Sequence, residues 1–261
     1  MKFRIFFITT MVLFLCYGMA LAVPTTVVVR VKSSDGKFVG TSMGGALVTI
    51  QEVLTGKLLA EGVTTGDTGD TEKIMKEPRK QGDPISDDDS ARFTAILNID
   101  TPTYVEIKAY GPQAQRQSAN TVSQTLWLIP GKNLDQGDAL MMELHGLVVD
   151  VIQPPTHIKV KGAPQTFKIK ANITLMCGCG ITPGGLWAPE DYEIKALIKK
   201  NGRSEGTLDL QYAGETSLFE GEFTAREPGT YEAVVYAVDG SAGNTGLDAV
   251  TFIVEPEKKA P

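Results

Sequence analysis

Short apolar and β-branched runs, separated by glycine- and proline-rich turns, dominate the chain after its first 22 residues. Residues 27–31 read Val-Val-Val-Arg-Val and lead into the turn signal Ser-Ser-Asp-Gly. Residues 93–99 and 104–109 alternate apolar and polar side chains, which is the period of a strand with one buried face. No segment keeps apolar residues at helical spacing over three turns. We therefore expect few helices and an all-β fold.

The expected strands form two sets. The first set comprises residues 27–31, 46–50, 93–99, 104–109, 125–129 and 140–144. The second set comprises residues 147–152, 166–176, 192–199, 206–210, 218–224, 231–238 and 248–254. Seven strands in roughly 110 residues are the number expected of an immunoglobulin-like sandwich. We expect two consecutive β-sandwich (immunoglobulin-like) domains, at residues 23–146 and 147–256, followed by a tail at 257–261.

The first 22 residues have the organisation of a secretory signal peptide. Lys2 and Arg4 precede an apolar run at 5–17, and Ala20-Leu21-Ala22 supplies a small-x-small cleavage site. The run is too short for a comfortable membrane span, so we expect cleavage after Ala22 and a secreted or periplasmic product without a membrane span. An uncleaved anchor is the alternative. Cleavage removes Cys16 and lowers the net charge from −6 to −8.

The composition excludes several classes of function. With 31 Asp+Glu against 25 Lys+Arg, the chain lacks the basic excess of a nucleic-acid binder. Three Cys and two His cannot build a dense disulfide scaffold or a His-rich metal centre. There is no H-E-x-x-H and no phosphate-binding glycine loop before a helix. His145 and His157 flank the domain boundary, and a Cys–His nucleophilic pair would need an approach across it. We expect no enzymatic activity.

Two sequence features of the second set carry a resemblance. Residues 228–239 read Pro-Gly-Thr-Tyr-Glu-Ala-Val-Val-Tyr-Ala-Val-Asp and are followed by Gly243-Asn244. The Pro-Gly-x-Tyr start, with Tyr231, resembles the tyrosine corner, and the tail resembles the F–G hairpin of bacterial immunoglobulin-like domains. Ala233 stands where an antibody domain has its second Cys. The resemblance therefore implies the sandwich fold without its usual inter-sheet disulfide, and implies almost nothing about function.

The first set resembles carboxypeptidase-regulatory-like or transthyretin-like modules. Residues 45–50 (Gly-Ala-Leu-Val-Thr-Ile), 55–57 (Thr-Gly-Lys) and 91–95 (Ala-Arg-Phe-Thr-Ala) follow the pattern G-A-x-V-x-I, T-G-x and G-x-F-x-A. Ala91 stands where that pattern has glycine, and a long insertion precedes it. The resemblance implies a β-sandwich. Such modules are usually stalks, adhesins or accessory domains.

The insertion at residues 66–90 concentrates charge. Its charged residues are Asp67, Asp70, Glu72, Lys73, Lys76, Glu77, Arg79, Lys80, Asp83, Asp87, Asp88 and Asp89. The EF-hand spacing D-x-[DN]-x-[DN]-G is absent. A polar stretch of this length is typical of a mobile surface loop. The alternative is a calcium or partner site, with Asp87, Asp88 and Asp89 as partner-binding candidates.

Two cysteines open a glycine-rich loop that runs from Met176-Cys177-Gly178-Cys179 to Trp187. In an oxidising compartment Cys177 and Cys179 most simply form a structural disulfide with each other. A copper site with Met176, Cys177 and Cys179 as soft donors is an alternative. Thiol-redox chemistry is another, because so small a ring favours an easily reduced disulfide. Trp187 either packs in the core after strand B or contacts a partner.

The sequence as a whole indicates a secreted, non-enzymatic binding or assembly protein of the bacterial envelope or extracellular space. The expected partner surfaces are exposed strand edges, the 66–90 insertion and the 177–187 loop. A copper-binding or thiol-redox accessory protein is the first alternative. A carbohydrate-binding module is the second, disfavoured because two Trp and seven Tyr form no evident aromatic row.

Overall fold

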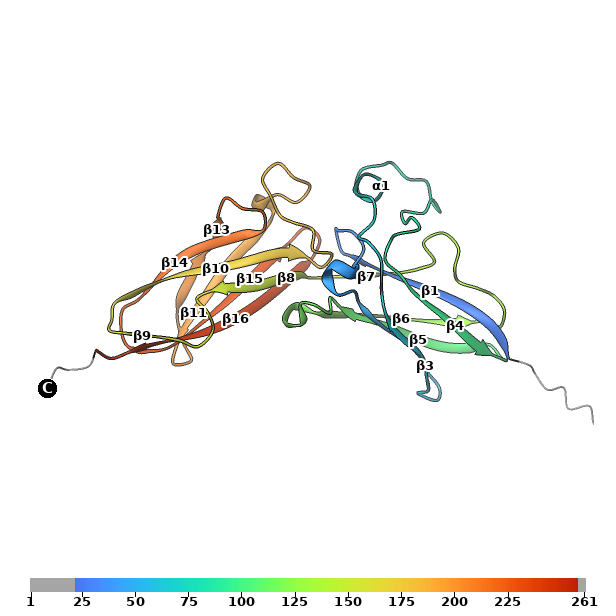
Figure 1. Ribbon diagram of the computed structural model, residues 1–261, viewed down its shortest axis with the longest axis horizontal. Coiled ribbons are helices and arrows are strands. Elements are labelled where there is room, and N and C mark those ends of the chain that lie inside the picture. Colours follow the sequence, from blue (N-terminus) through green and yellow to red (C-terminus); the bar gives the residue numbers. More distant parts are fainter. Residues whose placement is uncertain (1–21, 258–261) are drawn as a thin grey trace, which may run out of the picture.

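A computed structural model describes residues 22–257 and confirms the all-β class. Over this range the helices are α1 (Thr71–Met75) and three short 3-10 turns, η1 (Thr41–Met43), η2 (Arg116–Ser118) and η3 (Pro189–Asp191). Within the same range no helix is long and apolar enough to cross a bilayer. The predicted signal peptide, except Ala22, and the tail after Glu257 lie outside the described residues. Figure 1 shows two elongated groups of strands joined near the middle of the molecule.

The N-terminal sandwich has seven strands in two sheets, ordered β4-β1-β7 and β3-β2-β5-β6. Its strands are β1 (Val23–Ser33), β2 (Leu47–Glu52), β3 (Leu58–Val63), β4 (Phe93–Ile99), β5 (Thr103–Gly111), β6 (Asn120–Leu128) and β7 (Leu140–Leu144). Only β1 and β7 pair in parallel; the other neighbours are antiparallel. Alternate residues of β1 and β5, such as Val29 and Ile107, are fully buried between the sheets. This is the two-residue period read from the sequence.

The C-terminal sandwich has nine strands in two sheets, ordered β13-β14-β10-β8 and β12-β11-β15-β16-β9. Its strands are β8 (Leu147–Gln153), β9 (Ile158–Lys161), β10 (Gln165–Leu175), β11 (Glu193–Lys200), β12 (Arg203–Asp209), β13 (Gln211–Tyr212), β14 (Leu218–Ala225), β15 (Gly229–Asp239) and β16 (Asn244–Glu255). The expected seven strands are therefore too few. β9 and β13 have four and two residues, too short for a periodic signal. Pro154 and Pro155 lie where the chain crosses from the first sheet to the second.

The tyrosine corner predicted from the sequence is present in the C-terminal sandwich. The hydroxyl of Tyr231 donates a hydrogen bond to the carbonyl of Glu227 at 2.8 Å, just before β15 begins. The Tyr231 ring is buried and stacks on Phe252 with 5.4 Å between centroids. The corner therefore fixes the turn between β14 and β15 to the aromatic core, as in immunoglobulin-like sandwiches.

The 66–90 insertion is more structured than the expected mobile loop. It contains α1, whose first turn is capped by the Asp70 carboxylate accepting from Lys73 N at 2.8 Å. Ile74 and Ile85 are buried against Phe38 in a small separate core. The sequence did not indicate this core, because Phe38 lies well outside the polar insertion.

Replacing Tyr231 with Phe should lower the unfolding free energy by about 1 kcal/mol, because the ring packing stays and one partly buried hydrogen bond is lost. Urea unfolding followed by circular dichroism measures the change. Tyr236→Phe is the matched control, since Tyr236 lies on the same strand and its hydroxyl makes no hydrogen bond within residues 22–257. Equal stability of the two variants would contradict the proposed contribution of the corner.

Candidate functional site at the joint between the sandwiches

The linker between the sandwiches is two residues long. β7 ends at Leu144 and β8 begins at Leu147, so only His145 and Gly146 intervene. Gly146 has φ of +139°, and a Cβ built there would lie 2.1 Å from the terminal methyl group of Met176. The position requires glycine because of its positive φ and because the Met176 methyl group leaves no space for a side chain. A linker this short and closely packed restricts how far one sandwich can turn against the other.

Asn244 connects this linker to both sandwiches. It follows the hairpin between β15 and β16 and is fully buried. Its side-chain Oδ1 accepts from Gly146 N at 2.9 Å, and its Nδ2 donates to the carbonyl of Ser34 at 3.3 Å. Ser34 belongs to the turn after β1 of the N-terminal sandwich. One buried amide therefore satisfies backbone groups of both the linker and the neighbouring sandwich.

Asp239 shapes the hairpin that presents Asn244. Its carboxylate accepts from Ser241 N at 2.9 Å, Ser241 Oγ at 2.7 Å and Ala242 N at 3.1 Å. Burial alone would raise the pKa of Asp239, but these hydrogen bonds outweigh it and lower the pKa below its usual value. Asp35 shows the opposite shift: burial raises its pKa, and repulsion from Asp239 adds to the effect. Acidification therefore protonates Asp35 before Asp239 at this joint.

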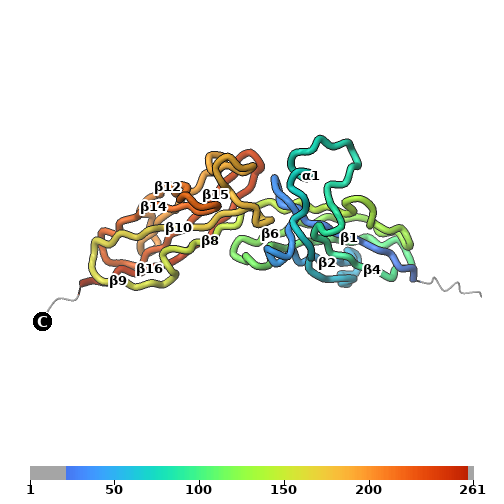
Figure 2. The backbone as a smooth tube through the Cα atoms, turned by 45° about the horizontal axis from the view of Figure 1, so that its top comes forward, coloured from blue at the N-terminus to red at the C-terminus, as the bar shows by residue number. Residues whose placement is uncertain are grey.

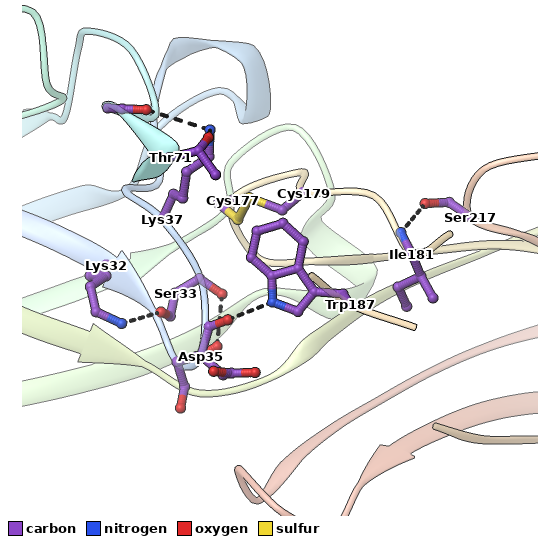
Figure 3. Close-up of a disulfide and its surroundings, with 12 residues drawn as sticks. Lys32, Ser33, Asp35, Lys37, Thr71, Cys177, Cys179, Ile181, Trp187 and Ser217 are labelled. Atoms are coloured by element: carbon purple, nitrogen blue, oxygen red, sulfur yellow. Dashed lines mark hydrogen bonds between the residues drawn. A yellow bond between two sulfur atoms is a disulfide. The ribbon is translucent and has the colours of Figure 1, made fainter. Parts of the chain in front are cut away.

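The cysteine loop forms a second contact across the joint. The sulfur atoms of Cys177 and Cys179 lie 2.15 Å apart as a disulfide, and both residues are buried. Between them Gly178, with φ of +77°, approaches the N-terminal sandwich so closely that a Cβ there would lie 2.7 Å from the Met43 sulfur. Trp187, beside the disulfide in Figure 3, donates from Nε1 to the Asp35 carbonyl at 2.7 Å.

A third contact covers the edge of β8. The Ser118 hydroxyl, in η2, donates to the carbonyl of Val149 at 3.1 Å and accepts from its N–H at 3.0 Å. Gln117 Nε2 donates to the same carbonyl at 3.2 Å. η2 therefore takes the place of a neighbouring strand at this position and holds β8 against the N-terminal sandwich.

The proposed copper donors do not converge. Met176 packs in the core cluster of the N-terminal sandwich, whereas Cys177 and Cys179 belong to that of the C-terminal sandwich. Both sulfur atoms of the cysteines are bonded to each other. Within residues 22–257, no group of three or more His, Cys, Asp or Glu side chains is arranged to hold a metal ion. The arrangement instead suits a structural disulfide that shapes the loop.

The other candidate residues are separated. Asp87, Asp88 and Asp89 are exposed, and the Asp87 carboxylate caps Ser90 N at 2.8 Å. Trp187 is 8% exposed and bonded across the joint, so its ring offers no surface to an external partner. His145 and His157 are both exposed and lie beyond opposite ends of β8.

No protein-family model and no curated protein matches the chain. Similar solved structures include the fibronectin(III)-like modules of Clostridium thermocellum CbhA, which are 12% identical to this chain. The match covers 90% of this chain and 94% of that chain, with a TM-score of 0.31. Titin domains z1z2 in complex with telethonin are 11% identical to this chain, with 91% of this chain and 98% of that chain covered and a TM-score of 0.25.

An engineered protein is 17% identical over 49% of this chain and 24% of its own, with a TM-score of 0.29. The chain thus spans about a quarter of that protein. TM-scores this low carry no argument about function, domain arrangement or partners. The assignment of β-sandwich architecture rests on the strand order and pairing described above.

Replacing Asn244 with Ala should destabilise the protein by about 2 kcal/mol, because the buried Gly146 N–H loses its partner and the Ser34 carbonyl keeps only the Ser33 hydroxyl, at 3.4 Å. Chemical unfolding measures the change. Asn98→Ala is the matched control: Asn98 is exposed on β4, so its loss should cost less than about 0.5 kcal/mol. A loss at Asn244 no larger than that at Asn98 would show that the amide does not hold the joint.

Proposed function

We propose that the protein is a secreted or periplasmic, non-enzymatic binding or assembly protein of the bacterial envelope or extracellular space, which presents two sandwiches to a partner at a fixed mutual angle. The observation that carries the proposal is the joint: a two-residue linker, the Asn244 amide and the Trp187 contact all restrain one sandwich against the other. Restrained orientation lowers the entropic cost of binding a partner with both domains.

The two resemblances support this role. In the N-terminal sandwich the motif residues serve the fold: Ala46, Val48 and Ile50 are buried, and Gly56 has φ of +72° in the β2–β3 turn. We take residues 23–146 as a carboxypeptidase-regulatory-like or transthyretin-like domain and residues 147–256 as a bacterial immunoglobulin-like domain. Stalk or accessory function follows from these resemblances and from the signal peptide in residues 1–22.

The 66–90 insertion is the partner surface in this proposal. It rises on the same side of the molecule as the loop after β10 (Figure 2). Met75 in α1 packs against the C-terminal core as well as against the insertion's own core, which anchors the insertion at the joint. The exposed carboxylates at Asp87–Asp89 therefore stand on a supported segment, and they suit a partner with a basic surface.

Changing Asp87, Asp88 and Asp89 together to Asn should reduce capture of the partner from an envelope fraction at least several-fold, because the anionic surface is lost. Tagged wild type, this variant and a matched control are compared by quantitative mass spectrometry. The control changes Glu205, Glu215 and Glu222 to Gln, which removes equal charge from exposed positions of the C-terminal sandwich.

The intact mass of the exported protein, measured by mass spectrometry, tests the proposed cleavage after Ala22.

Equal capture by all three proteins would exclude the insertion as the partner surface.

The two alternative functions, a copper or thiol-redox protein and a carbohydrate-binding module, are tested by separate measurements. A copper or thiol-redox protein should show bound copper or free thiols in the exported form. A carbohydrate-binding module should bind a glycan array through Trp127, which is 57% exposed beside Tyr104, and lose that binding in Trp127→Ala.

A further inference from the structure

The longest exposed stretch of the described chain carries two adjacent basic residues. Nine successive residues, 76–84, are exposed, and no other run within residues 22–257 is as long. They follow α1 and form the outer bend of the insertion, which projects from the N-terminal sandwich in Figure 2. Arg79 and Lys80 lie side by side near the middle of this bend. Both side chains and the backbone around them are therefore accessible to a large partner.

The backbone at the middle of the bend is held weakly. Within residues 22–257, four residues of the bend have no backbone hydrogen bond, namely Pro78, Arg79, Gln81 and Gly82. The Lys80 carbonyl accepts from Asp83 N at 3.1 Å, and Lys80 N donates to the Asp83 carboxylate at 3.0 Å. Both residues are exposed. Extending this turn costs little, because water replaces both hydrogen bonds.

The two ends of the bend are fixed to the fold. Before it, Ile74 of α1 is buried in the insertion's own core. After it, Ile85 and Ser86 are buried, and their N–H groups donate to the Asp138 carboxylate at 3.0 and 2.8 Å. Lys73 Nζ of α1 donates to the Ser86 carbonyl at 2.7 Å and so joins the two ends. The anchored ends can keep their places when the chain between them is extended or broken.

We propose that the bend at residues 76–84 is a processing site, at which a trypsin-like endoprotease cuts the folded chain once, after Arg79 or Lys80. Such a protease has a carboxylate in the pocket that receives the side chain before the cut bond, and it therefore selects Arg or Lys. The cut is a hydrolysis that consumes one water molecule. The peptide C–N bond breaks, the water hydroxyl bonds to the carbonyl carbon, and the remaining hydrogen goes to the leaving nitrogen.

Other accessible basic residues are poorer sites for such a cut. A protease draws several residues of extended chain into its cleft, and tight connections between paired strands resist this. Arg226 is exposed but lies in a three-residue connection between β14 and β15. Lys132 is exposed in a turn that its own N–H closes with a backbone hydrogen bond of 3.0 Å. After Lys76, the Glu77 N–H still donates to the Glu72 carbonyl at 3.0 Å, at the end of α1.

The cut leaves the two pieces bound to each other. The first piece contains β1, β2 and β3, and the second contains β4 to β16. β1 lies between β4 and β7 in one sheet, and β2 pairs with β5 in the other. Both sheets of the N-terminal sandwich thus join the two pieces, and hydrolysis yields a two-chain protein. This inference does not depend on the proposed function, because the cut is read from the mass of the chain and not from a partner.

Limited digestion of the native protein with trypsin, followed over time by intact mass, tests the proposal. Wild type should first give two fragments that meet at Arg79–Lys80 or Lys80–Gln81 and that elute together in size-exclusion chromatography. Changing Arg79 and Lys80 together to Gln should slow this first cut by about tenfold or more, since the specificity pocket loses its charged ligand. The matched control changes Lys132 and Arg226 to Gln, which removes equal charge from other exposed turns, and should be cut at the wild-type rate.

A destabilised variant shows whether the folded chain is the substrate. Ile107→Val removes a methyl group from the N-terminal core, outside the core of the insertion, and lowers stability. A cut that requires global unfolding would be faster in this variant, whereas a cut in the exposed bend should keep its rate. The proposal is overturned by a faster cut in Ile107→Val or by a first cut elsewhere. Equal rates for the two double variants, or fragments that separate without denaturant, would also overturn it.

Discussion

The buried amide of Asn244 and the two-residue linker that it closes are the constraint on which the arrangement of the two sandwiches depends. Neither sandwich needs the joint for its own sheets, because no strand pairing within residues 22–257 crosses it. The joint instead supplies the hydrogen-bond acceptor of the buried Gly146 N–H and a second donor to the Ser34 carbonyl, which also accepts from the Ser33 hydroxyl. A polar contact of this kind favours one orientation, since its hydrogen bonds are lost when the sandwiches turn.

The sequence predicted what local periodicity and turn chemistry determine. The alternation in β4 and β5 gave both strands, and Pro-Gly-x-Tyr located the Tyr231 corner. The Gly243-Asn244 tail was recognised as part of a hairpin, but its bond to Ser34 joins residues 210 positions apart, and no local pattern encodes such a pairing. Trp187 was ambiguous for the same reason: its partner, the Asp35 carbonyl, belongs to the other sandwich.

The cysteine loop acquires a structural meaning from its position. Cys177 and Cys179 shape a turn whose glycine packs on Met43, while Met176 fills the opposite core. The loop that seemed the most suitable place for chemistry is thus part of the contact between sandwiches. The surface left for the proposed partner is the acidic insertion, which packs on Arg30 of β1 and Met141 of β7.

Residual dipolar couplings test the central claim, that the joint fixes one sandwich against the other, most directly. Amide couplings are measured for the protein in a dilute aligned medium, with the β2, β5, β10 and β15 amides as reporters. If the joint is rigid, couplings from both sandwiches fit a single alignment tensor with the orientation seen in Figure 1. Two tensors of different magnitude would show independent motion and contradict the account.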